Sequence, residues 1–245
     1  MMNKEELRTI LEKHEKWVDD KNFGERAVLS GKDLSRENLN GSNLRYAFLE
    51  FANLRDANLR YADIRDARLI DADLSNANLK GADLSGAYLK DADLNNTNLR
   101  STEFNNANLT GANFYGADLR DAELKSANLR YADLTGVNLA RADLRGVCLK
   151  DAKLTHVNTL YAEGQRVISV QVDTSRLNNL ISYWVDLGVW TTGCFQGTLG
   201  ELKESIEKTH KENDFLRDRY YRVIDFILQE ADEDSKRIEG KDDEI

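Results

Sequence analysis

Residues 52–76 read ANLRD-ANLRY-ADIRD-ARLID-ADLSN, five copies of one five-residue unit with nothing inserted between them. Most copies hold a small residue, an Asp or Asn, a central Leu and two polar residues. The same register extends outward over residues 27–156, where 26 central positions follow one another from Leu29 to Leu154. An internal repeat of this extent outweighs local propensity when the fold is predicted.

The period of five predicts a solenoid. It fits neither a helix of 3.6 residues per turn nor a strand of period two, but it fits a chain that turns a corner every five residues. Four corners close a square coil of 20 residues, with the central residue and the small residue two before it facing inward. Coils stacked at the inter-strand spacing would form a rod about 31 Å long. The chain contains no proline, which agrees with coils that donate their backbone N–H groups to one another.

The repeat resembles the pentapeptide-repeat family, whose pattern is A(D/N)LXX, over a little more than half of the chain. The resemblance implies an all-β solenoid, a right-handed quadrilateral β-helix, with the central Leu, Ile and Phe side chains inside. By position it places Phe104 and Phe114 half a coil apart in the middle of the rod. The family includes dimeric DNA mimics that bind DNA gyrase, and many members without a known activity.

The flanking segments predict a division into four parts. Residues 1–26 form a capping helix and linker, 27–158 the β-helix, 159–231 a set of strands and helices that caps or dimerises, and 232–245 a disordered acidic tail. The apolar face expected of the first helix, over residues 3–20, consists of Leu7, Ile10, Leu11, His14, Trp17 and Val18. This helix is predicted to begin at a capping box of Asn3 and Glu6 and to cover the open end of the first coil.

The segment after the repeats predicts a small mixed domain. Strands are expected over 166–173, 180–187 and 189–195, and helices over 198–210 and 213–230, the first of them opened by a capping box of Thr198 and Glu201. Trp184, Trp190 and Phe195 would supply its core. The apolar face of the second helix must pack against the strands, the rod or a second copy of the chain.

The net charge of −9 is distributed unevenly. Residues 27–158 carry 17 Lys and Arg against 18 Asp and Glu, whereas residues 159–245 carry 11 against 18. An acidic chain argues against direct nucleic-acid binding. The charged start of the sequence does not resemble a signal peptide, no apolar run is long enough for a membrane span, and two Cys without a spacing pattern indicate no disulfide framework. We therefore expect a cytoplasmic protein.

No catalytic motif stands out. The sequence has no HExxH, GxSxG, GxGxxG or phosphate loop, so we expect no catalytic residue, no cofactor and no metal site. Cys194 lies in a Gly193–Gly197 segment that invites a nucleophile interpretation, but no partner His and third group accompany it. A buried structural thiol is the favoured interpretation.

Taking every fourth unit separates four walls of the rod. The first wall is the most acidic, and a possible DNA-mimic face is assigned to Asp33, Asp56, Asp73, Asp93 and Asp133. The second wall is basic, the third is mixed, and the fourth replaces Asp and Asn by Phe48, Arg68 and Tyr88. With Phe51 and Ile70, the aromatic residues of the fourth wall form a possible interaction patch of Phe48, Phe51, Ile70 and Tyr88.

Three functions follow from these features. The leading hypothesis is a non-enzymatic protein-interaction scaffold, in which the patch docks internally, contacts a second copy in a homodimer, or binds an unknown protein partner. The alternative, suggested by the resemblance, is a DNA mimic that binds DNA gyrase or topoisomerase through the acidic face. An enzyme within residues 160–245 ranks third, because no motif supports it.

Overall fold

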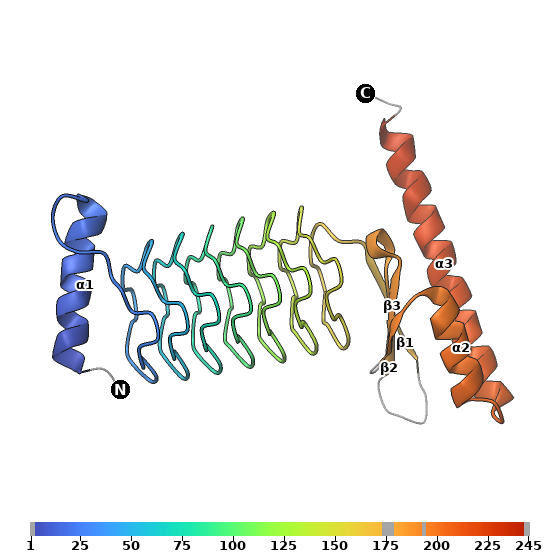
Figure 1. The fold of residues 1–245 in the computed structure, drawn as a ribbon. Coiled ribbons are helices and arrows are strands. Elements are labelled where there is room, and N and C mark those ends of the chain that lie inside the picture. The colour runs from blue at the N-terminus through green and yellow to red at the C-terminus, as the bar shows by residue number, and fades with distance from the viewer. Residues whose placement is uncertain (1–2, 173–178, 193–194, 243–245) are drawn as a thin grey trace. The chain divides into compact units, whose positions relative to one another are not determined.

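The computed structural model describes residues 3–172, 179–192 and 195–242 of the 245-residue chain (Figure 1). The chain divides into two compact units, Met1–Gly164 and Gln165–Ile245. The first unit ends later than the predicted limit of the repeats at residue 158, because one more lateral bridge, between Asp143 and Glu163, follows the last regular copy.

The first unit is a repeat β-helix with a coil of 20 residues. Parallel bridges join each residue before a centre to the residue 20 positions later, from Val28 and Phe48 at one end to Asp143 and Glu163 at the other. The backbone hydrogen bonds between coils repeat as well: the N–H of Leu34 donates to the carbonyl of Asn53 over 2.8 Å. The predicted coil length is therefore confirmed, while its right-handed winding stays a prediction.

Each corner contains a residue in the left-handed region, two positions after the centre. Tyr46, Asp56 and Gly81 have φ of 62°, 56° and 69°, and the N–H of Ala47 closes its turn on the carbonyl of Leu44 over 3.0 Å. A positive φ at the third residue of a turn is what a type II turn requires. Bulky residues tolerate this conformation here because hydrogen bonds to the neighbouring coil hold the backbone on both sides of the corner.

The Asp or Asn before each centre has a local structural role. Its Oδ1 accepts a hydrogen bond from the N–H two residues later, as Asp73 does from Ser75 over 2.9 Å. Asn side chains also donate to the residue one coil before, for example from Asn53 to Asp33 over 3.0 Å. These short polar side chains satisfy backbone donors at the turn, which explains why the repeat favours them.

The core consists of the inward positions that the repeat predicts. The centres are buried, and so are most of the small residues two positions before them; the centre Leu94 and its small neighbour Ala92 are both fully inaccessible. Phe104 and Phe114 meet edge to face with ring centroids 6.2 Å apart. Thr97 replaces Ala and remains satisfied, because its hydroxyl donates to the carbonyl of Leu74 over 3.1 Å.

Helix α1, Lys4–Asp19, contacts the first coil. Its predicted apolar face is buried or half-buried, and His14 accepts a hydrogen bond at Nδ1 from the N–H of Ala27 over 3.0 Å. The predicted capping box is wrong in detail: Asn3 caps the helix by accepting from the N–H of Glu5, which satisfies a donor without the side chain of Glu6.

The second unit contains a four-stranded antiparallel sheet and two helices. The strands β1 Val167–Val172, β2 Asn179–Trp184, β3 Val189–Thr192 and β4 Phe195–Gly197 lie in sequence order, and a short 3₁₀ helix, Val185–Leu187, joins β2 to β3. Helix α2, Leu199–Thr209, begins with the predicted capping box of Thr198 and Glu201, and α3 spans Asp214–Asp242.

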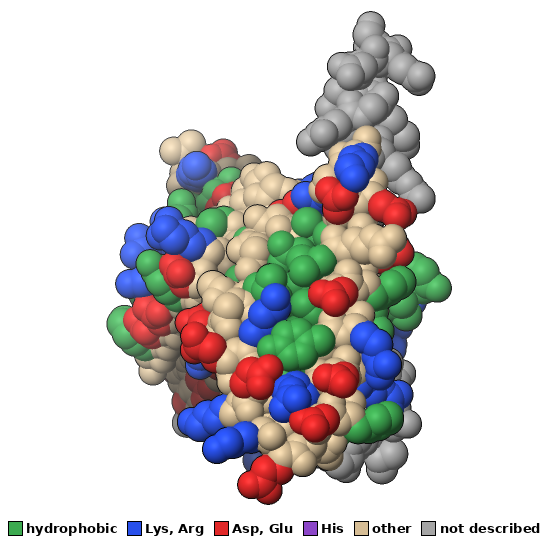
Figure 2. All heavy atoms as spheres, turned by 90° about the vertical axis from the view of Figure 1, so that its right-hand side faces the viewer, with side chains coloured by type: hydrophobic (Ala, Val, Ile, Leu, Met, Phe, Trp, Pro, Cys, Tyr) green, Lys and Arg blue, Asp and Glu red, His purple; other side chains and the backbone are tan. Residues whose placement is uncertain are grey.

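The helices bury one face of this sheet. Ile181 and Trp190 from the strands pack with Leu202, Ile206 and residues of α3, namely Tyr220, Ile224 and Ile227. Phe195 packs against this cluster, and so does Tyr183 of β2. Trp184 is the next residue of β2 and therefore points to the opposite face of the sheet, outside the cluster. Figure 2 looks onto the face of α2 and α3, where hydrophobic side chains lie among charged ones.

Helix α3 is longer than predicted. Residues 232–242 were expected to be disordered but continue the helix, in which Lys236 pairs with Asp232 one turn earlier at 2.6 Å. Such pairs favour a helix even where apolar residues are few. Residues 243–245 and Cys194 lie outside the described residues. Within those that are described, no helix has the length and apolar content needed to cross a membrane.

A central truncation tests the inward assignment. Leu94→Ala should lower the free energy of unfolding by about 2–5 kcal/mol, because it removes a fully buried side chain and leaves a cavity. Chemical denaturation followed by circular dichroism measures the difference, with exposed Lys90→Ala as the control. Equal stability of the two variants would contradict the inward position of Leu94.

His14 makes the stability of α1 depend on pH. Burial lowers the pKa of His14, and the charge of Arg26 lowers it further, although the carbonyl of Arg45 opposes this. The folded protein therefore binds the proton less readily than the unfolded chain. The stability that neutral His14 supplies is present above about pH 6.5, the unfolded pKa, and is lost as the pH falls below it.

We expect the thermal midpoint to fall between pH 6.5 and 5, and His14→Gln, which can accept the same hydrogen bond without titrating, to remove that part of the decline. Thermal unfolding of both proteins over this range makes the comparison. Parallel pH profiles would show that His14 is not responsible.

Candidate interaction surfaces

The fourth wall of the rod contains a hollow of about 630 Å³, lined by Ser30, Phe48, Glu50, Phe51, Arg68 and Ile70. We call it the Phe48 hollow. Its residues come from the first three coils, since Phe48 bridges to Arg68 in the next coil. Three of the four residues predicted for the patch therefore share one concave surface.

The aromatic residues of this hollow differ in exposure. Phe48 is half-buried, with the guanidinium carbon of Arg26 3.8 Å from its ring centroid and that of Arg68 at 5.9 Å. Phe51 stands at a corner with φ of 58° and is 66% exposed. Phe48 thus packs within the wall, while the ring of Phe51 is exposed to solvent.

An ion pair between Glu50 and Arg68 lines the hollow, and the cation of Arg26 lies next to it, over the ring of Phe48. Glu50 accepts from Arg68 Nε over 2.6 Å and from the hydroxyl of Ser30 over 2.7 Å. Burial would raise the pKa of Glu50, but these two hydrogen bonds, a backbone hydrogen bond and the charge of Arg68 together outweigh it and hold the pKa below its ordinary value. Burial and the neighbouring charge of Arg68 lower the pKa of Arg26, which makes its positive charge costly.

Tyr88 lies in the next coil of the same wall and does not line the hollow. It bridges to Arg68 and is 49% exposed. The sequence revealed Arg68 and Glu50 as departures from the repeat, although not their pairing. It gave no signal for Arg26, which precedes the first copy and reaches Phe48 only through the fold.

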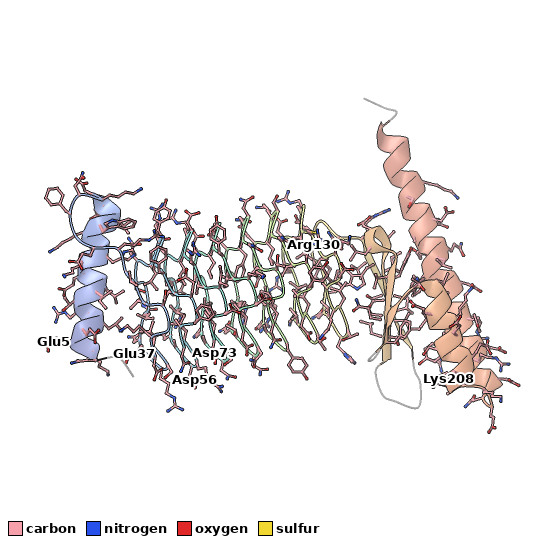
Figure 3. The ribbon with its side chains drawn as sticks, viewed as in Figure 1. Glu5, Glu37, Asp56, Asp73, Arg130 and Lys208 are labelled. Atoms are coloured by element: carbon pink, nitrogen blue, oxygen red, sulfur yellow. The ribbon has the colours of Figure 1, made fainter. Side chains whose placement is uncertain are left out.

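Four of the five residues assigned to the acidic face lie in one column of the first wall. Asp33, Asp73, Asp93 and Asp133 belong to one bridged column, which Asn53 and Asn113 interrupt and Lys153 ends. The assignment of Asp56 to this column is wrong, because Asp56 lies at a corner, two residues after its centre. Its Oδ2 is 3.6 Å from Nε of Arg36. Figure 3 shows Asp73 and Asp56 near the same edge of the rod.

The carboxylates of this column are engaged in local hydrogen bonds. The hydroxyl of Ser35, with other donors, lowers the pKa of Asp33 to about 2. Burial would raise the pKa of Asp133, but Lys153 at 2.8 Å and Thr135 outweigh it and lower the pKa. The column is therefore half-buried and partly neutralised, rather than a row of free charges.

The described residues contain no cluster of three or more His, Cys, Asp or Glu side chains that could hold a metal ion.

Solved structures of repeat proteins resemble this chain. HetL, a pentapeptide repeat protein involved in heterocyst differentiation regulation from Nostoc sp. strain PCC 7120, is 24% identical over 66% of this chain and 92% of its own, with a TM-score of 0.27. Rfr23 from Cyanothece 51142 is 43% identical over 39% and 62%, with a TM-score of 0.23. Full-length QnrB1, a plasmid-mediated fluoroquinolone resistance protein, is 16% identical over 56% and 84%, with a TM-score of 0.20. Among curated proteins, none matches.

The family model for pentapeptide repeats matches 8 copies over residues 25–60, 52–91, 87–125 and 122–158. These ranges join into one stretch that covers more than half of the chain, and the structure winds it into coils of four repeats. The chain belongs to the pentapeptide-repeat family.

Proposed function

We propose that this protein is a non-enzymatic scaffold that docks a protein partner at the Phe48 hollow. The exposed ring of Phe51 beside half-buried Ile70 carries the proposal, because exposed apolar surface on a rigid support usually marks an interface. The same proposal includes four further expectations. The β-helix winds to the right, α1 is a lid on the first coil, the C-terminal unit is a cap or a dimerising element, and the protein is cytoplasmic.

A second copy of the chain is the partner that the hollow favours. Its rim carries both signs, with Glu50 and Arg68 next to an apolar centre. A two-fold interface places the same patch on both sides, so the Glu50 of each copy could face the Arg68 of the other. A stable interface buries about 800 Å² per partner, so the contact would extend along the wall to Tyr88.

The family resemblance also suggests a DNA mimic that binds DNA gyrase, but the geometry gives this function less support. A mimic needs a continuous negative surface. Here Asn53 and Asn113 interrupt the column, and Lys153 neutralises Asp133. The basic second wall adjoins the acidic first wall and weakens its field further.

The dimer proposal predicts the effect of one exposed residue. Phe51→Asp should shift the protein from dimer to monomer, because it places a charge at the apolar centre of the interface. Sedimentation-velocity ultracentrifugation over a concentration series measures the state. Tyr131→Asp, which changes another exposed corner aromatic with φ of 61°, is the matched control and should remain dimeric.

Phe48 is a poorer choice for this test, since its contacts with Arg26 and Arg68 make a folding defect harder to separate from lost association. A wild-type protein that stays monomeric at the highest concentration would show that the hollow does not bind a second copy.

For the alternative function, we expect purified protein at micromolar concentration to leave DNA supercoiling by gyrase unchanged, because the carboxylates are interrupted and locally bonded. A supercoiling assay across a salt series measures this, with Asp73→Asn combined with Asp93→Asn as the comparison. Salt-sensitive inhibition that the double variant loses would instead establish DNA mimicry.

A further inference from the structure

The second wall of the rod, opposite the Phe48 hollow, carries four cations in four successive coils: Arg60, Lys80, Arg100 and Arg120, each directly after a centre. We call them the basic column. Hydrogen bonds place them one above another, as the N–H of Tyr61 donates to the carbonyl of Lys80 over 3.1 Å and that of Gly81 to the carbonyl of Arg100 over 2.9 Å.

Within the part of the chain that the structure describes, most of this column lacks an ion pair, although the charge of Arg100 helps to lower the pKa of Asp118 and of Asp121. Among the described residues, Arg60, Lys80 and Arg100 form no ion pair within 4.0 Å, whereas Arg120 binds Asp118 through two hydrogen bonds of 2.8 and 2.5 Å. The residues before the corresponding centres are neutral at Asn58, Asn78 and Asn98. Amides in place of carboxylates leave three successive cations unpaired.

The third wall offers a contrast. There Arg65 occupies the equivalent position and contacts Asp63 at 2.5 Å and Asp83 of the next coil at 3.3 Å. Asp63 thus pairs with the cation that follows it, whereas Asn58, Asn78 and Asn98 provide no such partner on the second wall.

The cations of the basic column change the pKa of a neighbouring side chain. A hydrogen bond from Arg60, followed by the charges of Arg60 and Lys80, lowers the pKa of Tyr61, whose ring lies across Gly81. A Cβ on Gly81 would come within 2.7 Å of that ring. The Nε atoms of Arg60 and Arg100 are buried, and the described residues provide no hydrogen-bond partner for them.

We propose that the basic column binds an acidic α-helix of a partner protein that lies along the rod and presents one carboxylate per turn. Coils repeat about every 4.8 Å and helical turns about every 5.4 Å. Four positions thus span about 14 Å on the column and about 16 Å on the helix, a difference that long side chains absorb. Alternate residues of a strand would span about 20 Å, which fits poorly.

The width of the wall also suits a helix. Three residues lie between corners, which gives about 10 Å, close to the diameter of one helix with side chains. A polynucleotide fits less well, because the chain carries a net charge of −9 and the adjoining first wall carries Asp33, Asp73, Asp93 and Asp133. Their field opposes a long polyphosphate more than a short segment confined to one wall.

The test uses the full chain and a fluorescein-labelled helical peptide with Glu at every turn of one face. A peptide of the same composition with its Glu residues scattered around the helix is the ligand control. Fluorescence anisotropy should show binding of the first peptide that weakens as salt rises. Lys80→Glu combined with Arg100→Glu should weaken it by about tenfold or more, because two attractive contacts become repulsive.

Lys90→Glu combined with Lys150→Glu is the matched control, since both residues are exposed on the opposite wall and the change in net charge is the same. This variant and Phe51→Asp should bind the peptide as the wild type does, which separates the basic column from the Phe48 hollow. If the reversal lowers the melting temperature, Lys80→Gln with Arg100→Gln provides the same comparison and should weaken binding as well.

Three results would overturn the proposal. One is equal binding of the two peptides, which would show that only net charge matters. Another is unchanged affinity after either substitution of Lys80 and Arg100 in a folded protein. The third is tighter binding of a single-stranded oligonucleotide than of the peptide, with the same two residues required, which would make the column a nucleic-acid surface.

Discussion

Lateral pairing between residues 20 positions apart is the constraint on which the first unit depends. Every coil gives backbone hydrogen bonds to the next, so each residue before a centre must meet its counterpart in the same register. A residue inserted in any copy would shift all later side chains to the wrong face. The uninterrupted period from Leu29 to Leu154 and the absence of proline follow from this one requirement.

The same pairing explains the composition of the repeat. A left-handed corner every five residues turns one large apolar and one small side chain inward, which gives the alternating buried ladders of Leu and Ala, with Phe104 and Phe114 at two of the central positions. The residue before each centre must satisfy a turn donor, which Asp and Asn do through Oδ1. The remaining positions make no contribution to the core, so they can carry surface chemistry without changing the fold.

Surface columns therefore have a chemistry set by which residue recurs every 20 positions. Where Asp precedes the centre, as at Asp63 and Asp83, a following Arg is paired and the wall is locally neutral. Where Asn replaces this Asp, as at Asn58 and Asn78, the cation that follows has no ion-pair partner among the described residues. A count of charges along the chain misses this distinction, since the rod as a whole is almost neutral.

The sequence by itself determined the coil length, the inward residues, the membership of each wall and most helix and strand positions. It could do so because a strict period turns sequence separation directly into distance in space. Only the tertiary structure decided that Arg26 covers Phe48, that Tyr88 lies outside the hollow and that the side chain of Asp56 faces Arg36. It also decided that α3 continues to Asp242. These features depend on side-chain reach and on contacts of segments outside the repeat, where no periodicity relates position in the chain to position in the fold.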